Sequence, residues 1–279
     1  MVPGAPGGDP SECASRACAA GPVSRPAGVD ANPPPNHGRN HVNPPHQLNE
    51  PIFASALSAT PGHIGVIMDG NRRWAREHRA TIQAAYAVGA ARLIEFLSWC
   101  DDAGVTTVTA WLINESNVTN RPAEEVSALL RVIEALMWGI VEQRRWRLAV
   151  TGDLSLLPDA LSASCLRAVE ATDGFNGPVL ICGIGHSGRI SIVAAIKALT
   201  VAASDVTPEA VTAHLAQNHQ PELDLVIRSS GEQRMSDMSI WQAAWAELYF
   251  SDCLWPDYSR ADFDRALDFY ASRQRRFGG

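Results

Sequence analysis

Met-Asp-Gly-Asn-Arg-Arg-Trp, at residues 68–74, follows directly on a short apolar run at residues 63–67. The run is typical of a buried parallel strand. In open α/β sheets, ligands bind at the carboxyl ends of the strands. A carboxylate, a glycine, an amide and two guanidinium groups arrive together at such an end, and we therefore expect a ligand site there.

The residue types in this stretch suit a ligand that carries phosphate. Gly70 lets the backbone approach a ligand closely, and the start of the next helix offers unpaired N–H groups to an anion. Arg72 and Arg73 can bind phosphate oxygens, and Asp69 can hold a magnesium ion. On spacing alone the stretch could equally be an ordinary strand-to-helix turn with a solvated basic start, so the rest of the chain decides.

The composition of the 279-residue chain excludes several classes of protein. A formal net charge of −7 argues against a general nucleic-acid-binding protein. No apolar run reaches the roughly 18 residues that a membrane-spanning helix needs. The six cysteines form no Cys-x-x-Cys pair, and Cys100, Cys165 and Cys182 lie in apolar patterns, which indicates buried thiols in a reducing compartment. A cytoplasmic location is the default expectation.

The first 61 residues differ from the rest of the chain. They hold 12 of the 18 prolines and almost no periodic apolar pattern, which is typical of a disordered or loosely attached arm. Their loosely spaced histidines, His37, His41 and His46, favour solvated side chains over a metal site. We expect the folded, catalytic domain to span residues 62–279.

From residue 62 onward, apolar runs alternate with helical patterns, which predicts one α/β domain with a mostly parallel six-stranded sheet flanked by helices. Strands are expected at residues 63–67, 105–113, 147–151, 179–182, 223–227 and 248–250. Helices are expected at 84–103, from 122 to about 145, and from about 158, 188, 208 and 262. No internal repeat is present.

A second group of anion-binding residues follows the fifth expected strand. Arg228 and Arg234 stand six residues apart, with a glycine between them and Ser236 beyond, a pattern that suits a second phosphate-like anion. Glu247 lies in an apolar setting, where an unpaired charge is costly. A metal ion shared with Asp69 would compensate this charge. The alternative is a structural glutamate paired with an arginine.

One motif indicates a different class of protein. Residues 183–188 read Gly-x-Gly-x-x-Gly after a strand and before a helix, which is the dinucleotide-binding fingerprint. That fingerprint belongs to the first βαβ unit, however, whereas this is the fourth strand. The acidic residue at about the right distance, Asp205, falls in a Ser/Ala loop. An NAD(P)-dependent oxidoreductase is therefore only a distant alternative.

Taken together, six motifs make the chain resemble the cis-prenyltransferase (undecaprenyl diphosphate synthase) family, in particular its short-chain actinobacterial type. They are Met-Asp-Gly-Asn-x-Arg-Trp at 68–74, Asn-Arg-Pro at 120–122, Arg-x-x-Gly-Glu-x-Arg-x-Ser at 228–236, Ala-Glu-Leu-Tyr-Phe at 246–250, Leu-Trp-Pro-Asp at 254–257 and Arg-Arg-Phe-Gly-Gly at 275–279. The resemblance covers residues 62–279.

The resemblance implies a homodimeric, Mg²⁺-dependent synthase of isoprenyl diphosphates, with a hydrophobic tunnel between helices. It assigns catalytic roles to Asp69, Asn114 and Asn117, and metal binding to Asp69 and Glu247. It assigns the allylic diphosphate to Gly70, Asn71, Arg72, Arg73 and Trp74. It assigns the acceptor diphosphate to Arg121, Arg228, Arg234, Ser236, Arg276 and Gly278, the last two in a tail that reaches the partner subunit's site. Phe96, Trp99 and Trp138 could floor a short cavity, although plain core packing is the commoner role of such residues.

The chain departs from the family pattern at several positions. Tyr86 stands where long-chain members carry histidine, and Ile82 stands where an arginine is usual. The loop that normally orients the homoallylic acceptor is one residue longer, with Asn114 in place of serine. Residues 185–189 read Gly-His-Ser-Gly-Arg where Asn-Tyr-Gly-Gly-Arg is usual, and His186 could be a base, an acceptor contact or a structural residue.

These departures concentrate around the acceptor and suggest an altered coupling geometry. The family has a branch of lavandulyl and cyclolavandulyl diphosphate synthases that joins allylic units head to middle, with dimethylallyl diphosphate as acceptor. Our hypothesis is a short product of this kind. The alternative is a regular Z,E-farnesyl diphosphate synthase that uses isopentenyl diphosphate. A non-catalytic subunit is disfavoured, because such partners tend to lack the carboxylate that Asp69 supplies.

Overall fold

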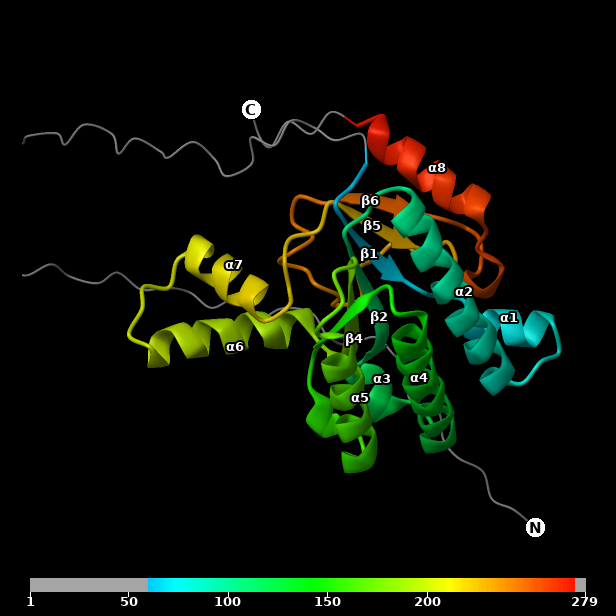
Figure 1. Cartoon of the computed structure of the whole chain (residues 1–279), viewed down its shortest axis with the longest axis horizontal. Helices are drawn as coiled ribbons and strands as arrows, with labels where there is room; N and C mark the ends of the chain where they lie inside the picture. Colours follow the sequence, from blue (N-terminus) through cyan, green and yellow to red (C-terminus); the bar gives the residue numbers. More distant parts are fainter. Residues whose placement is uncertain (1–59, 274–279) are drawn as a thin grey trace, which may run out of the picture. The chain divides into compact units, whose positions relative to one another are not determined.

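The computed structural model describes residues 60–273 (Figure 1). Six strands form one sheet in which every neighbouring pair is parallel, as predicted. They are β1 (His63–Ile67), β2 (Thr107–Asn114), β3 (Arg147–Thr151), β4 (Val179–His186), β5 (Leu225–Arg228) and β6 (Glu247–Phe250). The expected arm lies almost entirely outside the described residues, as do Arg276 and Gly278.

Helices connect the strands as the alternating pattern predicts. They are α1 (Asn71–Glu77), α2 (Ile82–Asp102), α3 (Glu115–Asn120), α4 (Ala123–Gln143), α5 (Asp159–Thr172), α6 (Gly188–Val201), α7 (Pro208–Gln217) and α8 (Arg260–Ala271), with single 3₁₀ turns at Leu154–Leu156 and Trp255–Asp257. Hydroxyl side chains cap several of these helices; Ser259 and Asp262, for example, form a capping box at the start of α8. Helix α3 was not predicted, because six residues are too few to show a helical period.

The order of strands along the sheet is β3-β4-β2-β1-β5-β6. The central strand β1 therefore has β2 on one side and β5 on the other, and this is the point where the strand order reverses direction. All residues of β1 and β5 are buried, as expected for strands that are covered on both faces. Since ligands bind at the carboxyl ends of strands at such a switch point, the topology places the expected site after β1, β2 and β5.

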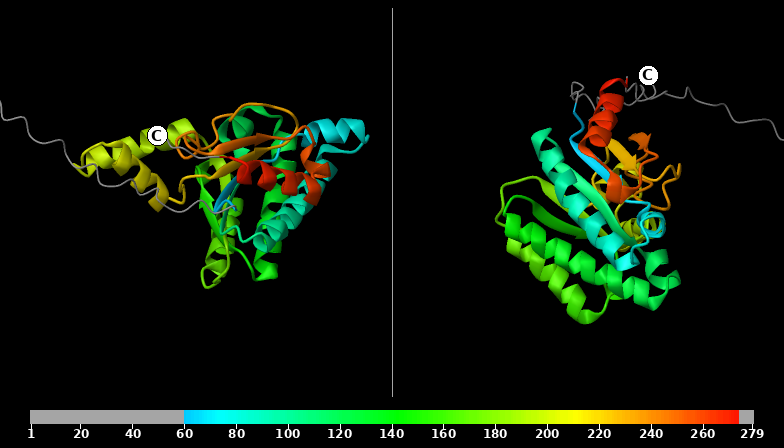
Figure 2. Two further views of the ribbon diagram at one scale, coloured as in Figure 1. Left: turned by 90° about the horizontal axis from the view of Figure 1, so that it is seen from above. Right: turned by 90° about the vertical axis from the view of Figure 1, so that its right-hand side faces the viewer.

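The sheet has a large core on one face and a smaller one on the other. Helices α8, α2, α4 and α5 lie side by side against the first face (Figure 2) and bury the main apolar cluster. The second face carries a smaller cluster of Ile67, Trp111, Leu223, Val226 and Met238. Helices α6 and α7 pack on each other through Ala195, Val211 and Leu215 and extend away from the sheet (Figure 1).

The glycines of the Gly-x-Gly-x-x-Gly sequence serve packing in this fold. Gly185 has a φ of 64°, and a Cβ there would lie 2.5 Å from the carbonyl oxygen of Asp153. A Cβ at Gly188 would lie 2.9 Å from the carbonyl oxygen of Asp237. Close backbone contacts thus account for these glycines without a dinucleotide. None of the helices within residues 60–273 is long and apolar enough to cross a membrane.

Candidate active site

Asp69 lies at the carboxyl end of the central strand, in the turn that leads into α1. The next residue, Gly70, has a φ of 106°, a conformation that favours glycine, and its N–H donates to Asp69 Oδ1 (2.7 Å). A Cβ at Gly70 would lie 3.0 Å from a side-chain carbon of Leu254 and 3.1 Å from that of Ser230. Gly70 therefore permits the tight turn and fixes the orientation of the Asp69 carboxylate.

The neighbouring strand β5 ends with Arg228, which lies beside Ile67 in the sheet. Arg228 Nη2 donates to Asp69 Oδ2 (2.8 Å), and Nη1 donates to Ser236 Oγ (2.8 Å) and to the carbonyl oxygen of Arg234. The Arg228 side chain is 3% exposed, whereas that of Asp69 is 37% exposed. A buried guanidinium thus holds together the carboxylate and the segment with Arg234 and Ser236, which the sequence predicted to act on two different diphosphates.

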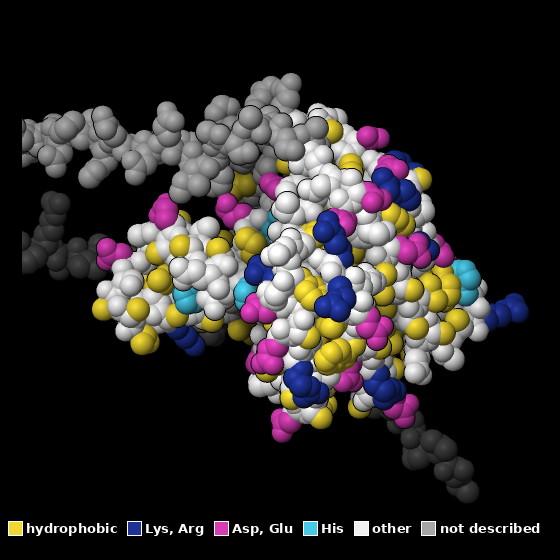
Figure 3. All heavy atoms as spheres, viewed as in Figure 1, with side chains coloured by type: hydrophobic (Ala, Val, Ile, Leu, Met, Phe, Trp, Pro, Cys, Tyr) yellow, Lys and Arg dark blue, Asp and Glu magenta, His cyan; other side chains and the backbone are white. Residues whose placement is uncertain are grey.

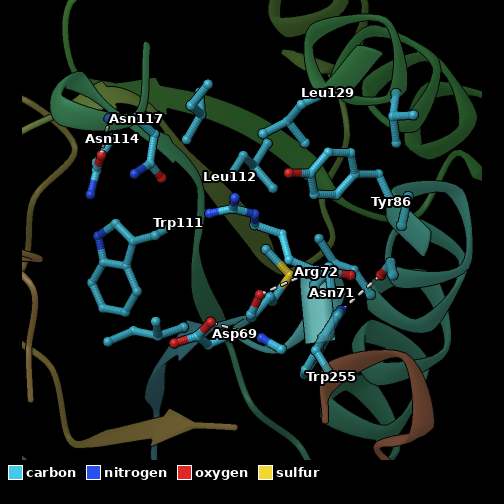
Figure 4. A pocket seen from close by; sticks show the side chains of 18 of the residues that line it. Asp69, Asn71, Arg72, Tyr86, Trp111, Leu112, Asn114, Asn117, Leu129 and Trp255 are labelled. Atoms are coloured by element: carbon cyan, nitrogen blue, oxygen red, sulfur yellow. Dashed lines mark hydrogen bonds between the residues drawn. The ribbon is translucent and has the colours of Figure 1, made fainter. Parts of the chain in front are cut away.

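A cavity of about 370 Å³ opens beside Asp69 (Figure 4). Its polar lining includes Asp69, Asn71, Arg72, Arg73, Arg76, Asn114, Asn117, Arg121, Arg228, Arg234 and Ser236. Its apolar lining from α2, β2 and α4 includes Leu93, Leu112, Ile113, Leu129, Val132, Ile133 and Leu136. A cavity with many guanidinium groups on one part and aliphatic side chains on the other suits a ligand with an anionic head and an apolar chain.

The aromatic residues considered for the floor of this cavity do not line it. Phe96 packs edge-on against Trp255 and Phe263, with ring centroids 5.7 and 5.3 Å apart, and belongs to the main core. Trp138 Nε1 donates to Ser164 Oγ (3.1 Å). Aliphatic side chains such as Leu93 and Leu136 form the apolar wall instead.

The two arginines expected to hold one diphosphate face different neighbours. Arg73 forms an ion pair with Glu232 (3.2 Å), which also pairs with Arg234. Arg72 lies 3.6 Å from Glu125 of α4, and its side chain is 65% exposed. Glu232 therefore links Arg73 to an arginine predicted for the acceptor side. The Arg234 guanidinium lowers the pKa of the Glu232 carboxyl, which keeps this link charged.

A hydrogen-bonded chain connects α2, α3 and α4 at the rim of the cavity. Arg121 Nη1 donates to the Tyr86 hydroxyl (2.9 Å), and Nη2 donates to Asn117 Oδ1 (3.0 Å). The Tyr86 hydroxyl in turn donates to Glu125 Oε1 (2.7 Å). Burial and the hydrogen bond to Glu125 raise the pKa of Tyr86 well above its usual value. Tyr86 therefore stays protonated and acts as a bridge that orients Arg121.

The pairing of β2 with β4 is irregular just before α3. Trp111 pairs with Gly183, Ile113 pairs with Ile184 and Asn114 pairs with His186, so that the register skips Leu112 on β2 and then Gly185 on β4. Leu112 and Ile113 consequently both line the cavity. Asn114 follows and caps α3, because its Oδ1 accepts the N–H of Asn117 (2.7 Å).

Comparison with known proteins identifies the family of this chain. Residues 67–278 match the model of the undecaprenyl diphosphate synthase family of prenyltransferases. The chain belongs to this family. The (2Z,6E)-farnesyl diphosphate synthase of Thermobifida fusca is 38% identical to it over an alignment of 249 residues, and the match covers 84% of this chain and 97% of that protein. The short-chain Z-isoprenyl diphosphate synthase of Mycobacterium leprae is 36% identical over 84% of this chain and 98% of that protein.

One solved structure is similar to this prenyltransferase in both fold and sequence. The lavandulyl diphosphate synthase of Lavandula x intermedia, in complex with dimethylallyl diphosphate, superposes with a TM-score of 0.74 at 31% identity. The match covers 79% of this chain and 99% of that one. The parallel sheet with its helices is thus the cis-prenyltransferase fold, and the chain is an enzyme that transfers prenyl groups.

Glu247, a predicted metal ligand of the prenyltransferase site, lies far from Asp69. It is the first residue of β6 and pairs with Leu225 at the amino-terminal end of β5, whereas Asp69 follows the carboxyl end of β1. Because all strands are parallel, the length of the sheet separates the two carboxylates. Glu247 instead pairs with Arg273 (3.7 Å). Within one chain the two carboxylates therefore lie at opposite ends of the sheet, and metal binding by Glu247 stays a prediction.

Trp74, predicted to contact the allylic diphosphate, also lies outside the cavity lining. Its Nε1 donates to Asp257 Oδ1 (2.8 Å), and its ring stacks on His78 with centroids 4.2 Å apart. These contacts join α1 to the turn that precedes α8. Trp74 therefore stabilises the helix that carries the arginines, and its contact with the allylic diphosphate stays a prediction.

Arg76 and most of the apolar lining, for example Trp111 and Met238, were not predicted from the sequence. Arg76 stands three residues after Arg73 on α1, and this spacing puts both side chains on one side of the helix, a signal that was available. Trp111 and Met238 lie on the second face of the sheet and also reach the cavity. Their apolar character gave no indication that they are more than core residues.

His186 is the last residue of β4 and is buried rather than part of an exposed loop. Burial lowers its pKa to about 4, so it is neutral near pH 7. Its Nε2 lies 3.4 Å from the N–H of Ser239, and it does not line the cavity. This placement favours the structural role among the three that the sequence left open.

The family of prenyl diphosphate synthases generally uses a divalent metal ion, and the site fits one. Among residues 60–273 no group of three His, Cys, Asp or Glu side chains could hold a metal on its own. Asp69, however, presents a partly exposed carboxylate to the cavity. Magnesium is commonly bound by one or two carboxylates together with the phosphates of a substrate. The donor set is thus suited to a metal that arrives with a diphosphate.

Proposed function

We propose that this enzyme couples two short allylic diphosphates head to middle and so forms a lavandulyl-type product. The donor is geranyl or dimethylallyl diphosphate, and the acceptor is dimethylallyl diphosphate. The observation that carries the coupling of two prenyl diphosphates is the Asp69–Arg228 pair, because it stands between two groups of guanidinium side chains at one cavity with an apolar wall. Two diphosphates and two prenyl chains can be bound around this centre.

The irregular coupling is supported by the acceptor loop. Register shifts at Leu112 and Gly185 alter the ends of β2 and β4, and the side-chain Oδ1 of Asn114 is engaged as the cap of α3. The likeness to a lavandulyl diphosphate synthase structure also supports it. In the coupling, the C1–O bond of the donor breaks and its electron pair leaves with diphosphate. The π electrons of the acceptor form the new C–C bond, and loss of one proton restores a double bond.

We assign substrate-binding roles to the residues from their positions in the cavity and their charges. Arg72, Arg73 and the Gly70–Asn71 turn bind the donor diphosphate. Arg121, Arg228, Arg234 and Ser236 bind the acceptor diphosphate, and Arg276 and Gly278 of a partner's tail complete its site. Asn114 and Asn117 orient the acceptor. Asp69 would hold Mg²⁺ against the donor diphosphate, where the ion would neutralise the charge that develops on the leaving group. The arginines supply preorganised donors to the same oxygens.

A regular synthase that makes Z,E-farnesyl diphosphate is the second candidate. The observation in its favour is the 38% identity to the (2Z,6E)-farnesyl diphosphate synthase of Thermobifida fusca. In that reaction isopentenyl diphosphate takes the place of the dimethylallyl acceptor. The Asp69–Arg228 pair serves both reactions, so the identity of the acceptor distinguishes them.

Incubation with defined substrates tests the proposal. The enzyme is given Mg²⁺ and dimethylallyl or geranyl diphosphate, each with and without isopentenyl diphosphate, and the alcohols released by phosphatase are separated and identified by mass. We expect a branched product from allylic diphosphates alone, and none when EDTA replaces Mg²⁺. A linear Z product that requires isopentenyl diphosphate would establish the second candidate instead.

We further propose that the enzyme is a homodimer. Helix α6 exposes several apolar side chains, among them Ile190 (54% exposed), Val193 (49%) and Val201 (88%), and apolar atoms are visible at the surface of the α6–α7 lobe (Figure 3). Within residues 60–273, β6 pairs with a strand on one side only, and Leu248 is exposed there. Exposed apolar patches and open strand edges mark interaction surfaces.

Light scattering is expected to give about twice the 30.0 kDa chain mass. Val193→Glu should shift the enzyme toward monomer, because a carboxylate would be buried without a partner in the interface. Leu166→Glu is the matched control, since Leu166 is also 49% exposed but lies on α5. A monomeric wild-type enzyme, or an equal response of both variants, would reject this dimer surface.

A further inference from the structure

The Trp111 ring packs flat on the sheet over two glycines, Gly65 and Gly183, which we call the glycine seat. A Cβ on Gly65 of β1 would lie 2.6 Å from the ring carbon Cη2 of Trp111, and one on Gly183 of β4 would lie 2.8 Å from Cδ1. Real Cβ atoms do not approach other atoms this closely. The indole therefore extends over the strands on both sides of β2, and only residues without a Cβ leave room for it.

The indole forms one wall of the cavity. It is 4% exposed, and its Nε1–H has no hydrogen-bond partner among the described residues. A buried N–H without a partner is unfavourable, and a bound ligand or water commonly supplies the missing acceptor. In Figure 4 the ring lies across the pocket from Tyr86 and Leu129, with Asp69 on one side of it and Asn114 on the other.

The two sides of the cavity differ in their charged neighbours. Tyr86, Leu129 and Leu93 line the part between α2 and α4, on the first face of the sheet. Trp111 clusters with Ile67 and Met238 on the second face. The Met238 N–H donates to the carbonyl oxygen of Met235, which places Met238 in the turn that directly follows Arg234 and Ser236. The apolar surface of Trp111 thus belongs to the side of the cavity that carries Arg228, Arg234 and Ser236 of the proposed acceptor diphosphate site, whereas Arg121 approaches that site from the Tyr86 side.

We propose that the Trp111 indole is the wall against which the prenyl group of the acceptor packs, and hence a residue that determines acceptor specificity. This inference rests on the proposed function, since it takes the Arg228 side of the cavity as the acceptor side. A flat aromatic ring fits the planar, branched end of a five-carbon prenyl group. Its position is set by the glycine seat, because the sheet beneath prevents the ring from moving away from the cavity.

The seat allows a test that touches no substrate. Gly65→Ala adds a methyl group under the ring and pushes it off the sheet toward the cavity, while the backbone of β1 has no positive φ that alanine would strain. Trp111→Leu removes most of the wall, and Trp111→Phe keeps an aromatic ring. Gly139→Ala is the matched control, because a Cβ at Gly139 of α4 would meet only one atom, at 3.9 Å.

Steady-state kinetics with donor and acceptor varied separately provide the readout. We expect Gly65→Ala and Trp111→Leu to raise the KM for the acceptor by about tenfold or more, in the range known for altered apolar pockets. The KM for the donor should change by less than about twofold. Trp111→Phe should lie between wild type and Trp111→Leu, and Gly139→Ala should match wild type. Donor hydrolysis in the absence of acceptor should persist in all four variants.

The experiment is run with dimethylallyl and with isopentenyl diphosphate as acceptor. A regular product would refute irregular coupling, yet the acceptor KM would still report on the wall, so the two failures are distinguishable. Equal increases in both KM values, or an unchanged acceptor KM in folded Gly65→Ala and Trp111→Phe, would overturn the inference. Thermal unfolding identifies any variant that does not fold, and Trp111→Phe then decides the outcome.

Discussion

Asp69→Asn is expected to lower kcat by about 10³-fold or more while leaving the enzyme folded. Loss of a single preorganised group that stabilises developing charge costs about 10²–10³ in rate, and here the proposed metal ligand and the partner of Arg228 are lost together. Asparagine has the shape of aspartate and can still accept the N–H of Gly70, so the turn should persist. Single-turnover rates with saturating substrates measure the effect on the chemical step.

Asp102→Asn provides the control for this prediction. The Asp102 side chain is 67% exposed and pairs with Arg260 at 3.3 Å, so its neutralisation changes the net charge by the same amount far from the cavity. We expect its kcat to stay within about twofold of wild type. If Asp69→Asn retained more than about a tenth of the wild-type rate, Asp69 would not be the catalytic carboxylate, and the proposed centre would have to be reassigned.

The fold was largely predictable because its strands are short apolar runs that alternate with helical patterns. The all-parallel sheet follows from that alternation, and the bounds of β3 and the start of α6 agree with the structure. The order of strands was not predictable, since nothing local states that β5 lies beside β1. The convergence of Asp69 and Arg228, which are 159 residues apart, was therefore expected only from motifs at strand ends.

The site differs from the expected one for two physical reasons. Glu247 was expected near Asp69 because a shared metal ion would compensate a charge in an apolar setting, but one residue stands at the start of a strand and the other after the end of one. In a parallel sheet these two positions lie at opposite ends of the strands. Trp111 was missed because the alternation of a strand tells which face a residue occupies but not whether that face is open to a cavity.

Arg228→Lys is expected to reduce both stability and activity. The Arg228 guanidinium is 3% exposed and serves Asp69, Ser236 and the Arg234 backbone at once. A lysine ammonium is a single point charge and cannot reproduce this planar fork. We expect a loss of about 2–4 kcal/mol, because a buried charge would be left with incomplete hydrogen bonding. This corresponds to a decrease in Tm of about 5–10 °C for a domain of this size.

The activity of Arg228→Lys should also fall, for a reason separate from its lower stability. Without the fork, Ser236 and Arg234 lose their common anchor, and the Asp69 carboxylate loses its fixed orientation. We expect kcat/KM to decrease by at least about 100-fold, in the range seen when one partner of a buried charge pair is removed. Arg167→Lys on the exposed surface of α5 should change neither Tm nor kcat/KM.

The double variant Asp69→Asn, Arg228→Lys shows whether the two residues act as one unit. If Arg228 acts mainly by holding Asp69, the second change should cost little once the first is made, so the losses in kcat/KM should be far from additive. Additive losses would mean that Arg228 binds its diphosphate independently of Asp69. In that case the ion pair would be incidental, and the Asp69–Arg228 pair could no longer carry the proposed arrangement of two diphosphates around one carboxylate.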